Sequence, residues 1–363
     1  RNRVTASGDH GITFTAGTRA STIEYNESDY NARPGVRAAN GIHLFGAPAN
    51  TVRRNRLHHN QDTGLHVQAA SDTTLSYQNT SWANGDHGFD HLSVLGSIHV
   101  GDVSYDNFTD GFSFEGNTRN QRMHDCISVA NGMTNGRYNL YVDSSSAIGH
   151  ISNDNILWNP TAQAPVKFDD VAYATVAAFA AASGNDTRTL QADPRFVAAS
   201  LGDFHLLAGS PAIDAANSGV FGWPGSDAEG YAPNDRPEVA NTGMGPVTFA
   251  DRGAYEYGSG ETVGVPDLPP AAAGLAGVTP NPLAGEGRLS FTTSRAGGLA
   301  VDLFDARGRL VRRLLARDDA PAGLFVMPLD ARGEDGRLLP AGIYLYRVRS
   351  VDGEKAGKFV IVR

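Results

Sequence analysis

The sequence predicts an all-β protein, a right-handed parallel β-helix solenoid followed by a small immunoglobulin-like β-sandwich. Three observations predict this fold. An asparagine recurs every 23 to 29 residues between positions 31 and 159. In four of these repeats a glycine follows, and after it a short segment in which apolar residues alternate with polar ones. The C-terminal stretch consists of short alternating segments broken by Gly and Pro, which is typical of a small sandwich.

The recurring asparagine marks one corner of each predicted coil. A repeat of this length with one half-buried strand cannot bury its apolar face alone, so the turns must stack into a solenoid. Stacking places equivalent positions of successive coils in columns about 4.8 Å apart. Asparagine side chains at a turn can bond backbone groups and, in a column, one another. We therefore expect a structural ladder formed by Asn31, Asn60, Asn84, Asn107, Asn131 and Asn159.

Glycines open the predicted strands. Gly41, Gly64, Gly88 and Gly111 each precede a segment with a period of two, such as Ile42-His43-Leu44. The first and third residues after the glycine are expected to point into the core and the second outward. The next turn is expected to continue the pattern with Tyr138-Asn139-Leu140. The expected outward column is His43, His66, Asp90, Ser113 and Asn139.

Charge is distributed unevenly along the 363-residue chain, whose length suggests two domains. Residues 278–363 hold 14 Lys and Arg against 10 Asp and Glu, a net charge of +4, so the total of −9 leaves −13 for residues 1–277. The negative charge of residues 1–277 argues against a nucleic-acid partner. It would also repel a polyanionic sugar unless a cation bridges the protein and the sugar. The single cysteine, Cys126, allows no internal disulfide and is expected to pack inside a coil.

No apolar run approaches the length of a membrane span, and no signal peptide is present. The chain begins with Arg in the middle of a repeat, so we expect a processed or truncated N-terminus. The expected state is a monomer.

The predicted organisation has three parts. Residues 1–258 form the β-helix with its closing region, the coils covering about 1–165 and an Ala-rich stretch from Asp170 to Ser183 forming a short helix. Residues 259–277 are rich in Gly, Pro and Ala and form a linker. Residues 278–363 form the sandwich.

Acidic residues and a histidine gather at the turns that precede the outward column. Asp62, Asp86, His87 and Asp110 lie within two residues of the strand-opening glycines, and Asp90 follows on the strand. Neighbouring carboxylates repel one another unless they are protonated or bound to a cation. Several aspartate oxygens suit Ca²⁺. The alternatives are a calcium site and a solvated acidic turn.

These residues resemble the calcium-binding turn of family nine pectate lyases. The resemblance rests on Asn84-Gly85-Asp86-His87-Gly88-Phe89-Asp90 and on Thr109-Asp110-Gly111-Phe112-Ser113-Phe114-Glu115-Gly116, and covers about residues 40–160. It implies that Asp62, Asp86 and Asp90 are calcium ligands. His87 stands where the family has a fourth aspartate, and Ser113 stands where it has the lysine that takes the proton.

The implied reaction is β-elimination in a uronate polysaccharide. A cation neutralises the substrate carboxylate and a base removes the adjacent proton. In the absence of the lysine, the candidate bases are His66 and His87, with pKa values near 6.5 when unperturbed. Arg122 or Arg137 could stabilise the negative charge that develops on the substrate. The complete set of expected site residues is His66, His87, Ser113 and Arg137 for catalysis, His43, Glu115 and Asn139 for substrate binding, and Asp62, Asp86, Asp90 and Asp110 for the metal.

The C-terminal stretch resembles the sorting domain of type IX secretion. The matching segments are Pro280-Asn281-Pro282, the run from Leu303 to Val311, Asp335-Gly336-Arg337, and the run from Pro340 to Tyr346. The resemblance implies bacterial export to the cell surface or the medium, with the secretion machinery as partner.

Three functions remain open. The first is a secreted Ca²⁺-dependent polysaccharide lyase acting on uronates. The second is a glycoside hydrolase that uses Asp86 and Asp90, or Asp62, as its paired carboxylates. The third is a non-catalytic surface protein that binds carbohydrate or mediates adhesion.

Overall fold

The computed structural model describes residues 2–258, 277–279, 281–283, 285, 287–293, 295, 297–320, 323–334 and 337–362. The chain divides into two compact units, Arg1–Glu261 and Thr262–Arg363. The expected linker 259–277 lies outside the described residues except for its last position. Pro280, Asp335 and Gly336 of the expected sorting motifs also lie outside them.

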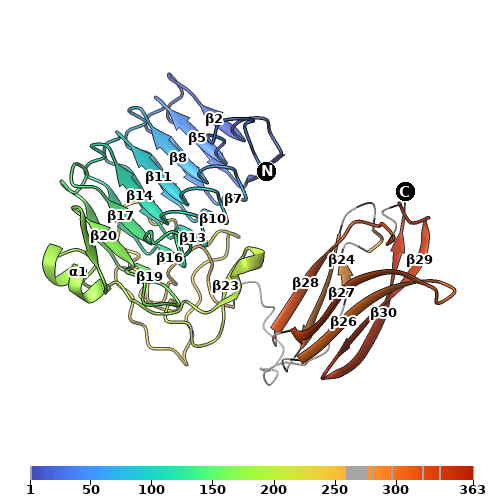
Figure 1. The fold of residues 1–363 in the computed structure, drawn as a ribbon. Helices are drawn as coiled ribbons and strands as arrows, with labels where there is room; N and C mark the ends of the chain where they lie inside the picture. The colour runs from blue at the N-terminus through green and yellow to red at the C-terminus, as the bar shows by residue number, and fades with distance from the viewer. Residues whose placement is uncertain are drawn as a thin grey trace. The chain divides into compact units, whose positions relative to one another are not determined.

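The N-terminal unit is a parallel β-solenoid in which each coil contributes one strand to each of three sheets (Figure 1). The first sheet contains β1 (Arg3–Thr5), β4 (Glu27–Asp29), β7 (Arg56–His58), β10 (Thr80–Trp82), β13 (Val103–Tyr105), β16 (Ile127–Val129) and β19 (Ile156–Trp158). The second contains β2 (Ile12–Phe14), β5 (Ile42–Phe45), β8 (Leu65–Gln68), β11 (Phe89–Leu92), β14 (Phe112–Glu115), β17 (Leu140–Val142), β20 (Val166–Phe168) and β21 (Val171–Tyr173). The third contains β3 (Thr22–Glu24), β6 (Thr51–Arg53), β9 (Leu75–Tyr77), β12 (Ile98–Val100), β15 (Arg122–His124) and β18 (Ile151–Asn153).

The core of the solenoid is filled by the alternating residues of the second sheet. Strand register places Leu65, Phe89, Phe112 and Leu140 in one column, and all four are fully buried. The Phe89 and Phe112 rings stack with centroids 4.7 Å apart. The predicted fold class and the predicted strands after the four glycines are therefore confirmed.

The predicted asparagine ladder is present along one corner. Side-chain amides donate to the next side-chain carbonyl from Asn31 to Asn60 and on through Asn84 and Asn107 to Asn131, at 2.7 to 2.9 Å. A second ladder, which the sequence analysis missed, runs along another corner. It joins Asn2, Asn26, Asn55, Asn79 and Asp102 at 2.9 to 3.2 Å.

The ladder also corrects one strand prediction. The amide of Asn139 accepts from Asn131 at 3.1 Å and donates to Asn159 at 3.0 Å, so Asn139 is an additional rung. β17 begins at Leu140, directly after Asn139, whereas the predicted strand began at Tyr138. The residue opposite Ser113 is Tyr141. Asn139 is fully buried and does not belong to the outward column.

The solenoid is closed by a short helix and long loops. The expected helix Asp170–Ser183 is shorter than predicted: α1 covers Val176–Ser183, and the preceding residues form β21. The Thr175 hydroxyl caps the helix by accepting from the Ala178 amide at 3.1 Å, and the buried Phe179 packs on Phe168 of β20. Beyond the helix lie β22 (Phe196–Ala198), η1 (Ala199–Leu201) and β23 (Asp203–Leu206).

Two further expectations can be checked on this unit. Cys126 is fully buried at the corner of the second ladder, and burial raises the pKa of its thiol well above the ordinary value. Such a thiol is unreactive, as the prediction of a packing role requires. Within the described residues, no helix has the length and apolar character needed to cross a bilayer.

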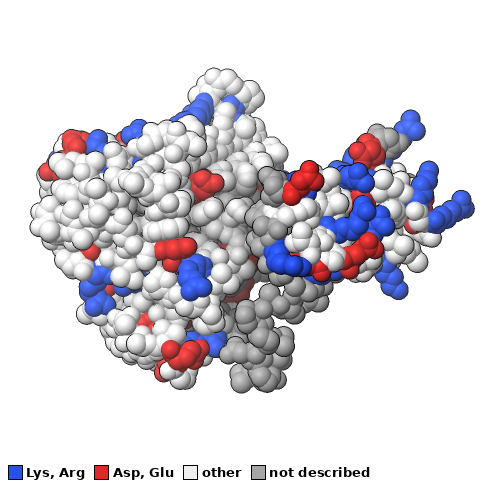
Figure 2. All heavy atoms as spheres, turned by 60° about the horizontal axis from the view of Figure 1, so that its bottom comes forward, with Lys and Arg blue, Asp and Glu red and all other residues white. Residues whose placement is uncertain are grey.

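The C-terminal unit is an antiparallel two-sheet structure. One sheet contains β24 (Gly277–Thr279), β25 (Gly287–Thr293) and β28 (Gly323–Leu329); the other contains β26 (Gly297–Asp305), β27 (Leu310–Ala320), β29 (Gly342–Ser350) and β30 (Gly353–Ile361). Leu289 and Phe291 share a core with Val301, Leu303 and Phe359. Figure 2 shows Lys and Arg side chains gathered on this unit, as the charge division of the sequence predicts.

Candidate functional site

The outer face of the second sheet carries one column of candidate functional side chains. Register pairs His43 with His66, His66 with Asp90, and Asp90 with Ser113. The column continues through Tyr141 to Lys167 of β20. The first four members are those predicted from the period-two pattern, and the last two replace the expected Asn139.

The turn before β11 is shaped by its small residues. Ala83 adopts a left-handed conformation with φ 52°, after which Asn84 enters the ladder. A Cβ on Gly85 would lie 2.2 Å from the Gln61 carbonyl oxygen, so no side chain fits there. The Asp86 amide donates to the Asp62 carbonyl of the preceding coil at 3.0 Å. The two aspartates are therefore stacked, as their spacing predicts.

An arginine that the sequence analysis missed bridges this pair. Arg37, on the loop before β5, places Nη2 2.5 Å from Asp86 Oδ2 and Nε 3.5 Å from Asp62 Oδ1. Burial and repulsion by Asp86 raise the pKa of Asp62 to about 7. Burial would also raise the pKa of Asp86, but His87 and the Thr109 hydroxyl hold it below its ordinary value.

His87 is held from behind by the following coil. Its Nδ1 lies 2.8 Å from Thr109 Oγ1, and this hydroxyl lies 2.7 Å from Asp86 Oδ1. If the hydroxyl donates to Asp86, it accepts a hydrogen from Nδ1, and Nε2 carries the lone pair. The Asp110 amide, whose nitrogen lies 3.3 Å from Nδ1, donates to this nitrogen and favours the other tautomer, with the hydrogen on Nε2. Burial would lower the pKa of His87, but Asp90, Asp86 and the other nearby carboxylates raise it above its ordinary value.

The two ring nitrogens of His87 face different carboxylates. Asp110 Oδ2 lies 3.6 Å from Nδ1, and its Oδ1 accepts from the Tyr138 amide at 2.7 Å. Burial raises the pKa of Asp110 to about 6. Nε2 instead lies 3.8 Å from Glu115 Oε1. Asp110 therefore lies behind the imidazole rather than on its open side.

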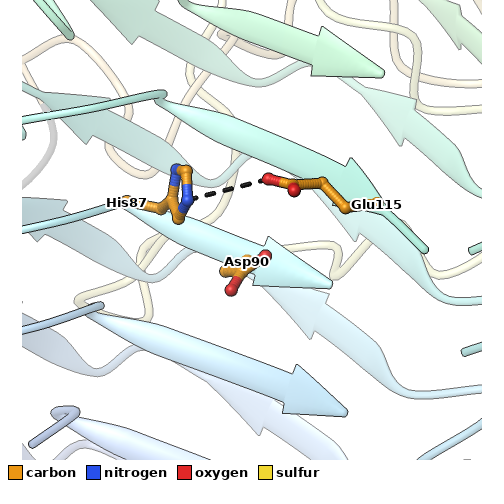
Figure 3. A group of neighbouring side chains, drawn as sticks. All are labelled: His87, Asp90 and Glu115. Carbon is orange, nitrogen blue, oxygen red and sulfur yellow. Dashed lines mark ion pairs between the residues drawn. The ribbon is translucent and has the colours of Figure 1, made fainter. Parts of the chain in front are cut away.

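His87, Asp90 and Glu115 form the tightest group of potential ligands within the described residues (Figure 3). One ligand atom from each lies within 4.8 Å of the others. Burial raises the pKa of Asp90 to about 6. The hydroxyl of Ser113, which is fully buried, donates to Glu115 Oε1 at 2.6 Å. Ser113 thus orients Glu115.

A row of histidines adjoins the acidic group. The rings of His10 and His43 lie 4.2 Å apart, and those of His43 and His66 lie 5.2 Å apart. Burial, aided by the other histidines, lowers the pKa of His43 to about 3 and that of His66 to about 4. His66 Nε2 lies 3.2 Å from Asp90 Oδ2. Both imidazoles are therefore neutral at pH 7 and provide polar contacts without charge.

Two cations flank the other end of the column. The Arg137 guanidinium lies 6.0 Å and the Lys167 ammonium 5.3 Å from the centre of the Tyr141 ring. Arg122, the alternative to Arg137, lies on β15 of the third sheet and is not part of this face.

Ten of the eleven expected site residues therefore share one face or the turn beside it; the exception is Asn139. The residues missed are Arg37, Thr109, Tyr141 and Lys167. For Tyr141, moving the final predicted strand by two residues would have placed it at the outward position in place of Asn139. Lys167 lies on the following strand, β20, which the repeat did not predict.

The fold and the site define a parallel β-solenoid protein with carboxylates and histidines clustered on the outer face of one sheet. No protein-family model matches the chain, and no curated protein matches it.

Several solved structures share parts of the fold. Pectate lyase Pel9A is similar over 70% of this chain and 72% of its own, with 15% identity and a TM-score of 0.37. The periplasmic alginate epimerase AlgG is similar over 44% of this chain, with 19% identity and a TM-score of 0.30. Latent PorU from Porphyromonas gingivalis is similar over 24% of this chain, with 23% identity and a TM-score of 0.21. The chain spans only 9% of the length of PorU and 33% of that of AlgG.

Proposed function

We propose that the protein is a Ca²⁺-dependent polysaccharide lyase that cleaves uronate-containing glycans, such as pectate, by β-elimination. The observation that carries this proposal is the position of His87, whose Nε2 opens toward Asp90 and Glu115 while Thr109 holds Nδ1. His87, as a proton acceptor, thus lies beside the Asp90 and Glu115 carboxylates, which can attract a cation, on the outer face of the solenoid. Elimination next to a carboxylate requires both parts.

The donor set fits a hard cation. Asp62, Asp86 and Asp90 offer oxygen atoms, which Ca²⁺ prefers. Burial raises the pKa values of Asp62 and Asp90, repulsion by Asp86 adds to the rise, and a bound cation would favour their charged forms. Arg37 lies across two of these carboxylates, and its half-exposed side chain can give way to a divalent ion. When bound, Ca²⁺ would neutralise the substrate carboxylate and make the adjacent C–H more acidic.

The residues of the chain divide the remaining work. The proton on the carbon next to the substrate carboxylate moves to His87 Nε2. The electron pair forms the new C=C bond as the C–O bond to the 4-linked sugar breaks, and the leaving oxygen takes a proton from water. Thr109 keeps the imidazole oriented through Nδ1, and Asp110 lies beside the same nitrogen.

Substrate carboxylates would bind at the other end of the column. Arg137 and Lys167 provide two positive charges around Tyr141, on a unit that is otherwise acidic. The half-buried Tyr141 ring suits the C–H-bearing face of a pyranose. His43 would contribute hydrogen bonds at the opposite end.

The test is the ultraviolet absorbance of the unsaturated product on a panel of polyuronates, with added Ca²⁺ and with chelator. We expect a Ca²⁺-dependent rise that Asp86→Asn with Asp90→Asn abolishes, together with Ca²⁺ binding measured by calorimetry. Asp169→Asn with Asp235→Asn, two exposed aspartates elsewhere on the unit, is the matched control. A flat trace on every substrate with folded protein contradicts the lyase, and unchanged Ca²⁺ affinity in the site variant contradicts the metal site.

A glycoside hydrolase is the second candidate, favoured by one observation. Asp62, with its pKa raised to about 7, stands beside Asp86, whose pKa is lowered, which is the pattern of an acid and its partner carboxylate. Reducing-sugar release without ultraviolet absorbance would favour it. Binding without either product would favour the third function, a carbohydrate-binding or adhesion protein.

The C-terminal unit is proposed to direct export by the type IX pathway to the bacterial surface or medium, with the enzyme acting as a monomer. Its support is the separate antiparallel sandwich with its own core. A reporter fused to residues 278–363 should leave a bacterium that has this pathway and remain inside a strain that lacks it. Retention in both strains would contradict the proposal.

A further inference from the structure

A hollow of about 480 Å³ lies at the corner of the solenoid beside the acidic turn. Its walls are Tyr30 and His59 on one side and Asp106, Phe108 and Met133 on the other. Tyr30 is 54% exposed and Phe108 is 49% exposed, so two aromatic faces are open to solvent. Its volume is in the range of ligand sites.

The hollow arises from a gap in a column of side chains. Tyr30, His59, Ala83 and Asp106 occupy equivalent places in successive coils, with φ between 50° and 54°. Only Ala83 among these four is small, and Gly85, which follows it closely, carries no side chain. The Tyr30 and His59 rings stack with centroids 4.9 Å apart and form a rigid wall. Asn135 donates to the Phe108 carbonyl at 2.7 Å and ties the neighbouring loop to the opposite wall.

We infer that this hollow binds an uncharged pyranose residue of the polysaccharide; the inference rests on the proposed function for the identity of the polymer. An aromatic face attracts the C–H bonds on one side of a sugar ring. Asp106, His59 and Thr134 offer polar groups to its hydroxyls.

Charge selects the uncharged sugar. The residues lining the hollow include no Lys or Arg, and Asp106 would repel a uronate carboxylate. Positive charge lies instead around Tyr141, on the outward column. The hollow and the acidic turn are continuous in the chain, since Ala83 and Gly85 lead directly to Asp86. The substrate class is therefore a heteropolysaccharide that contains both uronate and neutral sugars.

The test measures binding rather than cleavage. Calorimetry would use β-1,4-galactotetraose and xylotetraose as neutral probes, and trigalacturonate as the charged probe. Ala83→His fills the hollow with a residue that His59 shows to be compatible with this backbone. We expect Ala83→His to lower the affinity for at least one neutral probe by about tenfold, and Phe108→Ala to lower it by about fivefold.

Two controls separate this inference from the proposed function. Phe221→Ala removes an aromatic that is 75% exposed elsewhere and should change no affinity. Asp86→Asn with Asp90→Asn should abolish cleavage and leave neutral-probe binding intact. The binding of neutral sugars can therefore be tested even if the protein proves not to be a lyase. Absence of neutral-probe binding, or equal weakening of trigalacturonate by Ala83→His, overturns the inference. Circular dichroism checks that each variant is folded.

Discussion

Two corners of the solenoid carry the same kind of ladder and have different roles. Along the first, Asn60, Asn84 and Asn107 bond one another at 2.9 Å, and along the second Asn55 and Asn79 do so at the same distance. At the second corner each rung leads directly into the next strand. At the first corner a short turn intervenes and holds the acidic residues. The ladder therefore has a structural role at both corners, and only the first corner is followed by a turn whose side chains could take part in a reaction.

The largest effect is expected from substituting a histidine at each corner, His87 at the candidate site and His99 beside the second ladder. His87 faces the site, whereas His99 is fully buried with Nδ1 2.8 Å from Asp102 of the second ladder. His87→Gln removes the proton acceptor and should lower kcat by about a thousandfold with little change in stability. His99→Gln breaks a buried pair and should lower the free energy of unfolding by about 3 kcal/mol, while the folded enzyme keeps its kcat. Initial rates and urea unfolding measure the two effects; equal kcat losses would remove the distinction.

Breaking a rung should have the next largest effect. Asn107→Ala removes an acceptor of the Asn84 amide and one donor to the Asn131 carbonyl, which keeps the bond from the backbone amide of residue 107. Asn79→Ala likewise removes an acceptor of the Asn55 amide and a donor to Asp102. Each should lower the free energy of unfolding by about 2 to 4 kcal/mol. Only Asn107→Ala should also reduce the activity of the folded protein, because Thr109 follows two residues later. Urea titration followed by circular dichroism gives the stabilities. Loss of activity in Asn79→Ala at equal foldedness would contradict the division of roles.

The acidic turn should also make Ca²⁺ binding depend on pH. The folded-state pKa values of Asp62 and Asp90, about 7 and about 6, are raised above the ordinary 3.8, so ionising them costs stability as pH rises through these values. Protons and Ca²⁺ compete for the same carboxylates. Saturating Ca²⁺ should therefore raise Tm more at pH 8 than at pH 5.5, as differential scanning calorimetry would detect. Asp62→Asn should reduce this difference, and a larger shift at the lower pH would contradict it.

The repeat made the fold predictable from the sequence, and most of the outward column followed from it. Period two places His43, His66, Asp90 and Ser113 without further information, because each follows a strand-opening glycine. The pattern failed where Asn139 took the place of that glycine and became a rung. Arg37 could not be placed, because it lies on a loop whose path follows no period. The second ladder was overlooked because its rungs change from asparagine to aspartate at Asp102.

The smallest expected effect concerns the cations around Tyr141. Arg137 precedes β17, which lies two strands from Asp90 along the column, and Lys167 lies on β20, three strands away. Both cations are too far to act on the reacting bond but are placed to hold a carboxylate of the same polysaccharide chain. Lys167→Ala with Arg137→Ala should therefore raise KM by about fivefold and leave kcat unchanged, since the lost contacts hold the substrate equally in the ground state and the transition state. The increase should shrink at high ionic strength, where exposed charges are screened. Arg122→Ala, which removes an exposed arginine of the third sheet, should change neither constant. A fall in kcat in the double variant would instead place one of these cations at the reacting centre, and the functional face would then extend further along the column than His87 and its carboxylates.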